Sequence, residues 1–263
     1  MYSFEYHRPL SLADATALLQ GREDAKLLAG GQTLLPTLKQ RLAQPTDLID
    51  LGRIPDLRGI CAEGDGVTIG AGVTHHEVRF DPTVKATIPA LAELAGLIGD
   101  PQVRNRGTLG GSIANNDPAA DYPAALLALG ATVRTDRRRI AAHDFFTGLF
   151  ETALEPGEIV VAVHFPRPER AKYTKFRNPA SRYAVVGVFV AVIGGGVRVA
   201  VTGAGACVFR WTEAERALAA DFSPAALDGL TVDASDLNSD LHASAEYRAH
   251  LVRVMAQRAV AGA

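Results

Sequence analysis

Two glycine-rich stretches constrain this chain more than any other feature of its sequence. "LLAGGQTLLP" at positions 27–36 places Gly30 and Gly31 between an apolar, strand-like run and a helix-like run. "RNRGTLGGSIANNDPAADYP" at positions 104–123 also carries a glycine pair, and it leads into a proline-started helix. Glycine lets a ligand approach the main chain closely, so each stretch is a candidate binding turn.

In the first stretch, a strand feeds a helix through the segment from Gly30 to Thr33. Such a turn directs several backbone N–H groups toward one point beside the positive end of the helix, and it can bind phosphate without Lys or Arg. The pattern lacks the G-x-G-x-x-G of a Rossmann fold and the G-K-[ST] ending of a Walker loop. Taken alone, "AGGQT" is more often an ordinary tight turn.

The second stretch changes that interpretation. Hydroxyls flank its glycines at Thr108 and Ser112, and Asn115 and Asp121 follow. Hydroxyls and glycine amides suit a diphosphate, whereas an ionised carboxylate suits the hydroxyls of a ribose or ribityl chain. Together, the two stretches predict one extended dinucleotide held from both ends.

The composition is that of an ordinary globular protein. The 263 residues suffice for two modest domains or one large one, with 48% hydrophobic and 21% charged residues. A net charge of −2 argues against nucleic-acid or anionic-membrane binding as the main role. The N-terminal residues show no signal-peptide pattern, and the longest uncharged run is short and broken by glycines. We therefore expect a cytoplasmic protein without a membrane span.

The chain offers no reactive constellation of its own. Cys61 and Cys207 are expected to be buried thiols rather than a disulfide, and two cysteines cannot hold a four-thiolate iron–sulfur cluster. His75 and His76 have no partners at zinc spacing. Neither a G-x-S-x-G elbow nor a catalytic cysteine signature occurs. The sequence thus predicts no metal site and no catalytic residue in this chain.

Periodicity and cap signals give a coarse map of the elements. The N-terminal third alternates helices and strands, and a hairpin follows around Glu63–Gly66. Helices are expected after Pro89 and from Pro123 to Gly130. The expected elements of the first third are a helix over 11–21, a strand over 26–29, a helix over 34–41 and a strand over 48–51.

The C-terminal third is predicted to contain an antiparallel strand pair and a final helix. Two β-rich runs are joined by Gly194–Gly196, which predicts an antiparallel pair. A final helix is predicted after Ser244, with one apolar stripe made of Tyr247, Leu251, Val254 and Met255. The short, charged, proline-bearing segment 165–172 is the expected domain boundary, and the arginines at 137–139 are expected on a solvated hairpin turn.

Four segments carry a family resemblance: "LLAGGQTLLPTLKQRLAQPTDLIDL", "IGDPQVRNRGTLGGSIANNDPAADYPAALLALGA", "TGLFETALEPGEIV" and "KFRNPASRYAVVGV". On these segments, the chain resembles the FAD-binding medium subunit of the molybdenum hydroxylases, the family of aerobic carbon monoxide dehydrogenase and xanthine dehydrogenase. The resemblance implies an α+β fold. A two-lobed FAD-binding domain of the vanillyl-alcohol-oxidase (PCMH) type would cover 1–170, with lobes of about 1–57 and 58–170. A small C-terminal domain of antiparallel strands and helices would cover 171–263.

The resemblance also implies which residues contact FAD. The two glycine stretches would hold the diphosphate, and Asn115 and Asp121 the sugar-alcohol and phosphate portion. Lys175 matches a basic residue near the pyrimidine end of the flavin, where an ammonium would raise the reduction potential. Tyr183 matches an aromatic residue that lies against the isoalloxazine. The expected cofactor-binding residues are Ala29, Gly30, Gly31, Gln32, Thr33, Leu34, Ile98, Thr108, Gly110, Gly111, Ser112, Asn115, Asp121, Val160, Lys175 and Tyr183.

The function implied by the resemblance is electron transfer. A partner large subunit would carry the molybdenum cofactor, and a small subunit would carry two [2Fe–2S] clusters that deliver electrons to FAD in this chain. The assembly would be a dimer of heterotrimers, and the reduced flavin would serve an external acceptor. Two alternatives stay open, namely a stand-alone FAD-dependent oxidase or dehydrogenase and a non-catalytic nucleotide-binding assembly module. Carbon monoxide, a purine, an aldehyde or an N-heterocycle all remain possible substrates of the whole enzyme.

Overall fold

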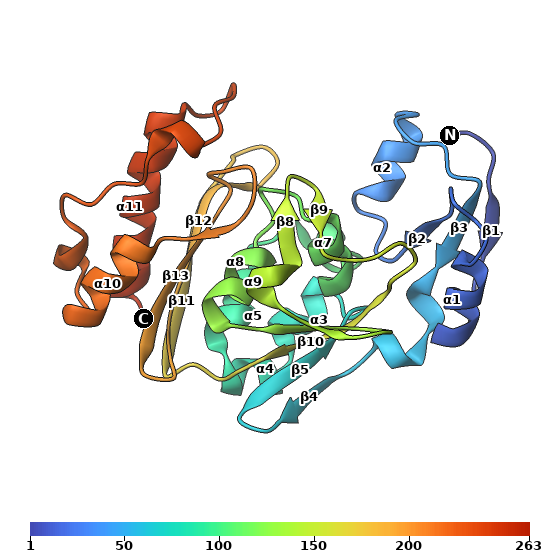
Figure 1. Cartoon of the computed structure of the whole chain (residues 1–263), viewed down its shortest axis with the longest axis horizontal. Helices are drawn as coiled ribbons and strands as arrows, with labels where there is room; N and C mark the ends of the chain where they lie inside the picture. The colour runs from blue at the N-terminus through green and yellow to red at the C-terminus, as the bar shows by residue number, and fades with distance from the viewer.

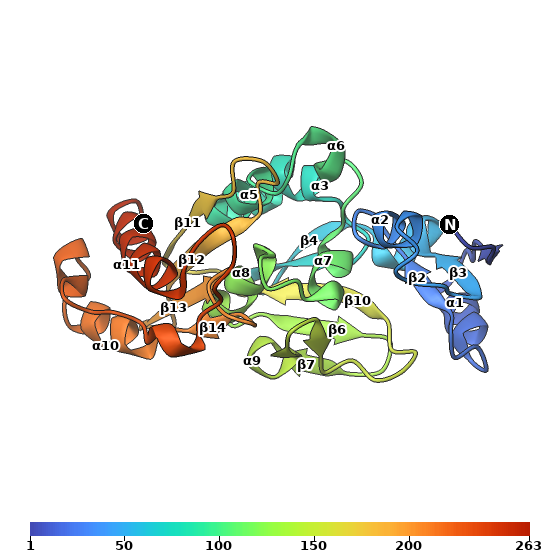
Figure 2. The same ribbon diagram turned by 90° about the horizontal axis from the view of Figure 1, so that it is seen from above.

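The chain folds into a row of sheets and helices with its two termini toward opposite ends (Figure 1). The computed structural model describes residues 1–263, with sheets of three, five, four and two strands. Figure 2 shows the N-terminal sheet at one end, the five-stranded sheet in the middle and the C-terminal sheet with its helices at the other end. This mixture of helices and separate sheets confirms the α+β class.

The first sheet is parallel, in the strand order β1-β3-β2. The helix that joins β1 to β2 begins after Ser11, whose side chain accepts a hydrogen bond from the backbone N–H of Asp14. The predicted alternation is confirmed, although both helices end about two residues earlier than expected. The elements are β1 (Glu5–His7), α1 (Leu12–Leu19), β2 (Lys26–Leu28), α2 (Leu34–Lys39) and β3 (Asp47–Asp50).

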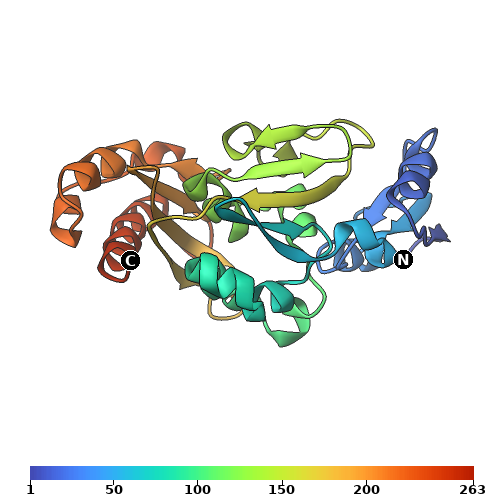
Figure 3. The same cartoon turned by 90° about the horizontal axis from the view of Figure 1, so that it is seen from below.

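The five-stranded sheet is antiparallel throughout, in the order β4-β5-β10-β6-β7. Its first two strands form the hairpin that the sequence predicted around Glu63–Gly66. Figure 3, which views the molecule from below, shows this sheet between the two ends of the molecule. Its strands are β4 (Ile60–Glu63), β5 (Gly66–Gly70), β6 (Thr132–Thr135), β7 (Arg139–Ala141) and β10 (Val160–Phe165), and a small ribbon pairs β8 (Phe146–Gly148) with β9 (Glu151–Thr152).

The helices that accompany this sheet include the two predicted from prolines. The helix over Tyr122–Leu129 has Pro123 in its first turn and ends at Gly130, as predicted, and nearly all of its side chains are buried. The helices are α3 (His75–Phe80), α4 (Pro82–Thr87), α5 (Pro89–Gly96), α6 (Pro101–Arg104), α7 (Leu109–Asn115), α8 (Tyr122–Leu129) and α9 (Ala142–Phe145).

The third sheet is an antiparallel meander, β11-β12-β13-β14, with helices on both faces. One face packs against α5 and α8, and the other packs against the two C-terminal helices, as Figure 2 shows. The predicted strand pair joined by Gly194–Gly196 is confirmed. The elements are β11 (Arg170–Arg177), β12 (Ala184–Ile193), β13 (Gly196–Thr202), β14 (Phe209–Arg210), α10 (Thr212–Ala220) and α11 (Ala245–Ala261).

The buried face of α11 differs from the predicted stripe. Leu251 and Met255 are buried as predicted, but Tyr247 is 44% exposed. Arg248 takes an inner position instead, because its guanidinium donates hydrogen bonds to the carbonyl oxygens of Val185 and Gly203. A buried arginine whose two terminal nitrogens bind carbonyl oxygens and the Asp240 carboxylate gives α11 a buried face that hydrophobicity alone does not select.

The cysteine prediction is correct in one respect and wrong in another. Both thiols are free, as expected. Cys61 is exposed rather than buried, and Cys207 is half-buried. Cys61 lies on β4, an edge strand of the five-stranded sheet, so it lacks a second neighbouring strand.

Candidate cofactor site

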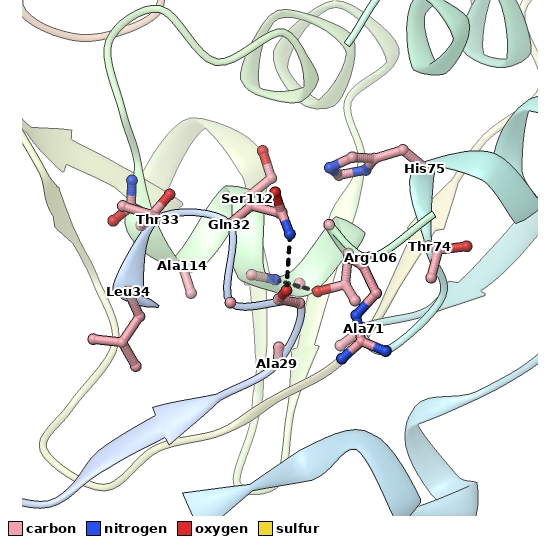
Figure 4. Close-up of a pocket in the computed structure, with 18 of the residues that line it drawn as sticks. Ala29, Gln32, Thr33, Leu34, Ala71, Thr74, His75, Arg106, Ser112 and Ala114 are labelled. Carbon is pink, nitrogen blue, oxygen red and sulfur yellow. Dashed lines mark hydrogen bonds between the residues drawn. The ribbon is translucent and has the colours of Figure 1, made fainter. Parts of the chain in front are cut away.

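A cavity of about 1140 Å³ brings the two glycine stretches together. This volume exceeds the roughly 300–1,000 Å³ of common small-molecule pockets, so it accommodates a ligand as long as a dinucleotide. In Figure 4, Gln32 and Thr33 of the first stretch lie beside Ser112 and Ala114 of the second. The two segments, far apart in sequence, therefore line one site.

The two stretches touch through their main chains. A Cβ atom added at Gly30 would lie 2.2 Å from the carbonyl oxygen of Arg106 and 2.7 Å from the Cα of Gly107. Real Cβ atoms do not approach backbone so closely, so glycine is required for this contact rather than for a turn conformation. The contact fixes the position of the first turn against the second.

The first turn presents unused hydrogen-bond donors. None of the backbone N–H groups from Gly30 to Leu34 donates a hydrogen bond within the chain. Gly31 has a positive φ of 71°, which turns successive N–H groups toward a common side. Consecutive free N–H groups of this kind form an anion-binding concavity. The residues present therefore fit the diphosphate of a dinucleotide.

The second stretch is a helix N-terminus whose amides are already used. Thr108 caps α7 by accepting from the N–H of Gly111, at 3.1 Å. The N–H of Gly110 donates to the carbonyl oxygen of Ala71, at 2.8 Å, and that of Leu109 donates to Val73, at 3.0 Å. These bonds fasten α7 to the segment after β5 and leave its first amides unavailable to a ligand.

The second stretch contributes side chains, rather than amides, to the cavity. Ser112 and Asn115 line it, and neither side chain forms a hydrogen bond within the chain. Asn116, the next residue, points away and holds the β8–β9 ribbon, because its Nδ2 donates to the carbonyl oxygens of Gly148 and Glu151. One hydroxyl and one carboxamide therefore remain free for a polar ligand.

Sequence reasoning missed the segment from Ala71 to His75, which also lines the cavity. The sequence marks this segment only weakly, because "GAGVT" at positions 70–74 lacks the third glycine of a dinucleotide fingerprint. His75 is only 4% exposed, and burial, with help from Arg104, lowers its pKa to about 4. The imidazole is therefore neutral at physiological pH, and its buried Nδ1 has no hydrogen-bond partner.

The remaining expected residues fall into two groups. Ile98, Val160 and Tyr183 line the cavity, with Tyr183 half-exposed. Asp121 lines it as well, but Lys175 does not. The Lys175 Nζ instead donates to Asp121 Oδ2 at 2.9 Å, behind the cavity wall.

The C-terminal sheet supports this wall. The hydroxyl of Thr202, at the end of β13, donates to the carbonyl oxygens of Ala120 (2.6 Å) and Pro118 (3.1 Å). The N–H of Gly203 also donates to Pro118, at 2.8 Å. The chain between α7 and α8 is thus held in place by residues about 80 positions later in the sequence.

No group of three or more His, Cys, Asp or Glu side chains is arranged to hold a metal ion. None of the helices combines the length and the apolar character that crossing a bilayer requires.

Comparison with known proteins decides the family. Residues 2–168 match the family model described as "FAD binding domain in molybdopterin dehydrogenase". The chain belongs to this family. It is therefore an oxidoreductase subunit with an FAD-binding fold, which confirms the resemblance stated from the sequence.

Full-length relatives agree with this assignment. The carbon monoxide dehydrogenase medium chain of Hydrogenophaga pseudoflava is 39% identical, with 98% of this chain and 96% of the relative covered. The nicotine 6-hydroxylase medium subunit of Paenarthrobacter nicotinovorans is also 39% identical, with the same coverage of both chains. These two medium subunits thus match this chain over nearly their whole length.

Solved structures have the same fold. Carbon monoxide dehydrogenase from Hydrogenophaga pseudoflava, in a form lacking the Mo-pyranopterin moiety, superposes with a TM-score of 0.89 at 38% identity, covering 99% of this chain and 96% of that one. Quinoline 2-oxidoreductase from Pseudomonas putida 86 superposes with a TM-score of 0.88 at 32% identity, covering 100% of this chain and 97% of that one.

Proposed function

We propose that this chain is the FAD-carrying electron-transfer subunit of a multisubunit molybdenum hydroxylase and that the cavity holds the FAD. The observation that carries the proposal is the run of unpaired backbone N–H groups from Gly30 to Leu34 in a cavity of dinucleotide size. When bound, FAD supplies the redox chemistry, and the protein positions it and tunes its potential.

Different residues contact different parts of the cofactor. The first turn takes the diphosphate through its amides, while Ser112 and Asn115 bind polar groups with their side chains. Ile98 and Val160 supply apolar contacts, and Tyr183 lies against the flavin ring. Gly110 allows α7 to pack closely against Ala71, because a Cβ there would lie 2.5 Å from the Ala71 Cβ, and this contact holds α7 at the cavity.

The partners of this chain are inferred from the names of its relatives. Relatives are named medium chains, a name that implies larger and smaller companions. We propose a large molybdenum-cofactor subunit, a small subunit with two [2Fe–2S] clusters, and a dimer of such heterotrimers. We further propose a cytoplasmic location and a division into an FAD-binding domain over 1–170 and a C-terminal domain over 171–263.

The substrate is chosen outside this chain. Relatives named for carbon monoxide and for nicotine are equally similar to it, at 39% identity each. If this subunit formed the substrate pocket, its sequence would differ more between enzymes that act on different substrates. We therefore propose that another subunit of the assembly selects the substrate.

The direct test is to purify the protein with its co-expressed genomic neighbours and to record the visible spectrum. We expect bound flavin, with iron–sulfur absorbance from partner chains. A protein that is colourless and takes up no added FAD contradicts the proposal and favours an assembly module. Flavin reduction by a small substrate without any partner favours a stand-alone oxidase or dehydrogenase.

Asn115→Ala should weaken FAD binding about two- to tenfold, because it removes a polar contact worth about 0.5–1.5 kcal/mol. The measurement is titration of FAD into apoprotein, followed by flavin fluorescence. Asn238→Ala is the matched control, because the Asn238 side chain donates to the carbonyl oxygen of Gly205 and lies outside the cavity lining. Equal affinities for the two variants would remove Asn115 from the site.

A further inference from the structure

A buried polar cluster lies directly behind the cavity wall. Asp121 Oδ2 accepts from the Nζ of Lys175 at 2.9 Å, and Asp121 Oδ1 accepts from the hydroxyl of Tyr173 at 2.5 Å. The side chains of Asp121 and Lys175 are 4% and 2% exposed, and Tyr173 is 3% exposed. The Lys175 Nζ also donates to the carbonyl oxygen of Leu97, at 3.2 Å. Every member of the cluster therefore has a partner.

The C-terminal sheet supplies two of the three side chains of this cluster. Tyr173 and Lys175 are two residues apart on β11, so both side chains lie on the sheet face that packs against α5 and α8. Lys175 pairs with Gly187 on β12, and a Cβ atom at Gly187 would lie 2.2 Å from the Tyr173 hydroxyl oxygen. The glycine thus leaves the space that the phenol needs to reach Asp121.

Only one of the three residues in this cluster reaches the cavity. Asp121 lines the cavity, whereas Lys175 and Tyr173 do not. Asp121, the residue that carries the carboxylate, is therefore the member of the cluster nearest to any ligand. A buried cation with its counter-ion in contact carries no net charge as a pair, and its influence on a neighbouring group is that of a dipole rather than that of a unit charge.

The ionisation of the cluster depends on its partners. Burial raises the pKa of Asp121, and Lys175 and Tyr173 both oppose that rise. Burial also raises the pKa of Tyr173 well above its ordinary value, so the phenol remains a hydrogen-bond donor. Removing that donor leaves the carboxylate with less support for its charge.

We propose that the flavin is tuned by a compensated Asp121–Lys175 ion pair rather than by a free lysine cation, and that Tyr173, admitted by Gly187, is the positioning residue that holds the pair. This inference rests on the proposed function, because it takes FAD to be the ligand of the cavity. It assigns Tyr173 and Gly187 an effect on the reduction potential although neither reaches the cavity.

The experiment is an anaerobic redox titration of the flavin in the assembled holoenzyme. Asp121→Asn should raise the midpoint potential, because it leaves the Lys175 ammonium uncompensated beside a flavin that becomes anionic on reduction. The double variant Asp121→Asn/Lys175→Met should return the potential close to the parent value. If Asp121→Asn has no effect, or if the double variant falls clearly below the parent, the lysine acts alone and the inference fails.

Two milder variants keep the test informative if Asp121→Asn does not assemble. Tyr173→Phe and Gly187→Ala should each shift the potential in the same direction by a smaller amount, with unchanged flavin content. Tyr247→Phe and Gly196→Ala are matched controls: Tyr247 forms no hydrogen bond through its hydroxyl, and a Cβ at Gly196 meets nothing nearer than 3.7 Å. Shifts no larger than those of the controls overturn the inference, and a holoenzyme without flavin overturns both it and the proposed function.

Discussion

Gly30→Ala should weaken FAD binding roughly 5- to 150-fold while leaving most of the fold intact. The added methyl would lie 2.2 Å from the Arg106 carbonyl oxygen and 2.7 Å from the Gly107 Cα, and both are backbone atoms that cannot rotate away. The first turn would have to move off the second, and the free N–H groups from Gly30 to Leu34 would move with it. Overpacking of this kind costs about 1–3 kcal/mol, equivalent to an affinity loss of roughly 5- to 150-fold.

The measurement is the flavin-to-protein ratio after gel filtration, together with the affinity of apoprotein for added FAD. Gly205→Ala is a matched control, because a Cβ there meets its nearest atom at 3.5 Å in ordinary contact. Thermal unfolding of both variants separates loss of the site from loss of the fold. Full flavin content and parental affinity in Gly30→Ala would show that the two turns need not touch for the cofactor to bind.

The elements that the sequence predicted well are those specified by neighbouring residues. The helix over Tyr122–Leu129 follows from Pro123 in its first turn and Gly130 at its end, and the hairpin at Glu63–Gly66 follows from alternation on both sides of a turn. These signals act within a few residues, so a single sequence carries them. The family resemblance supplied the fold class and the cofactor, and the comparisons confirm both.

The details of the site depend on contacts that no local pattern shows. The sequence suggested that both glycine stretches offer amides to a diphosphate. In the structure, the amides of Leu109 and Gly110 bind Val73 and Ala71 instead, so only the first stretch keeps its amides free. The same long-range bonds bring the segment after β5 to the cavity.

Charged residues show a second limit of sequence patterns. The arginines at 137–139 suggested a solvated turn; Arg137 and Arg138 do lie in the turn between β6 and β7, and Arg139 begins β7. Arg138, however, forms two hydrogen bonds to the side chain of Glu158, which is fully buried at the edge of the cavity. The partner is 20 residues away and has no sequence feature that marks it.

Arg138→Met should lower the free energy of unfolding by about 1.5–3 kcal/mol at pH 7, the range for hydrogen bonds to a charged group. Its Nε and Nη2 bind the two oxygens of Glu158 at 3.0 and 2.9 Å, and Thr135 and the N–H of Glu155 bind the same carboxylate. Without the guanidinium, a buried carboxylate would remain undercompensated. Urea unfolding of the purified chain measures the loss, and Arg139→Met is the matched control, because Arg139 is exposed and forms no ion pair.

The pH dependence of that loss tests its cause. Hydrogen bonds from Arg138, with smaller contributions from Glu155 and Thr135, lower the pKa of Glu158 from 4.5 to about 2. A carboxyl whose pKa is depressed in the folded state stabilises the fold above pH 4.5, and this contribution is lost as the pH falls toward 2. The difference between the parent and Arg138→Met should therefore shrink between pH 4.5 and pH 2. A loss at pH 7 no larger than that of Arg139→Met would mean that the guanidinium does not stabilise the fold. A larger loss that stays constant over this pH range would mean that the guanidinium acts through packing and not through the buried charge.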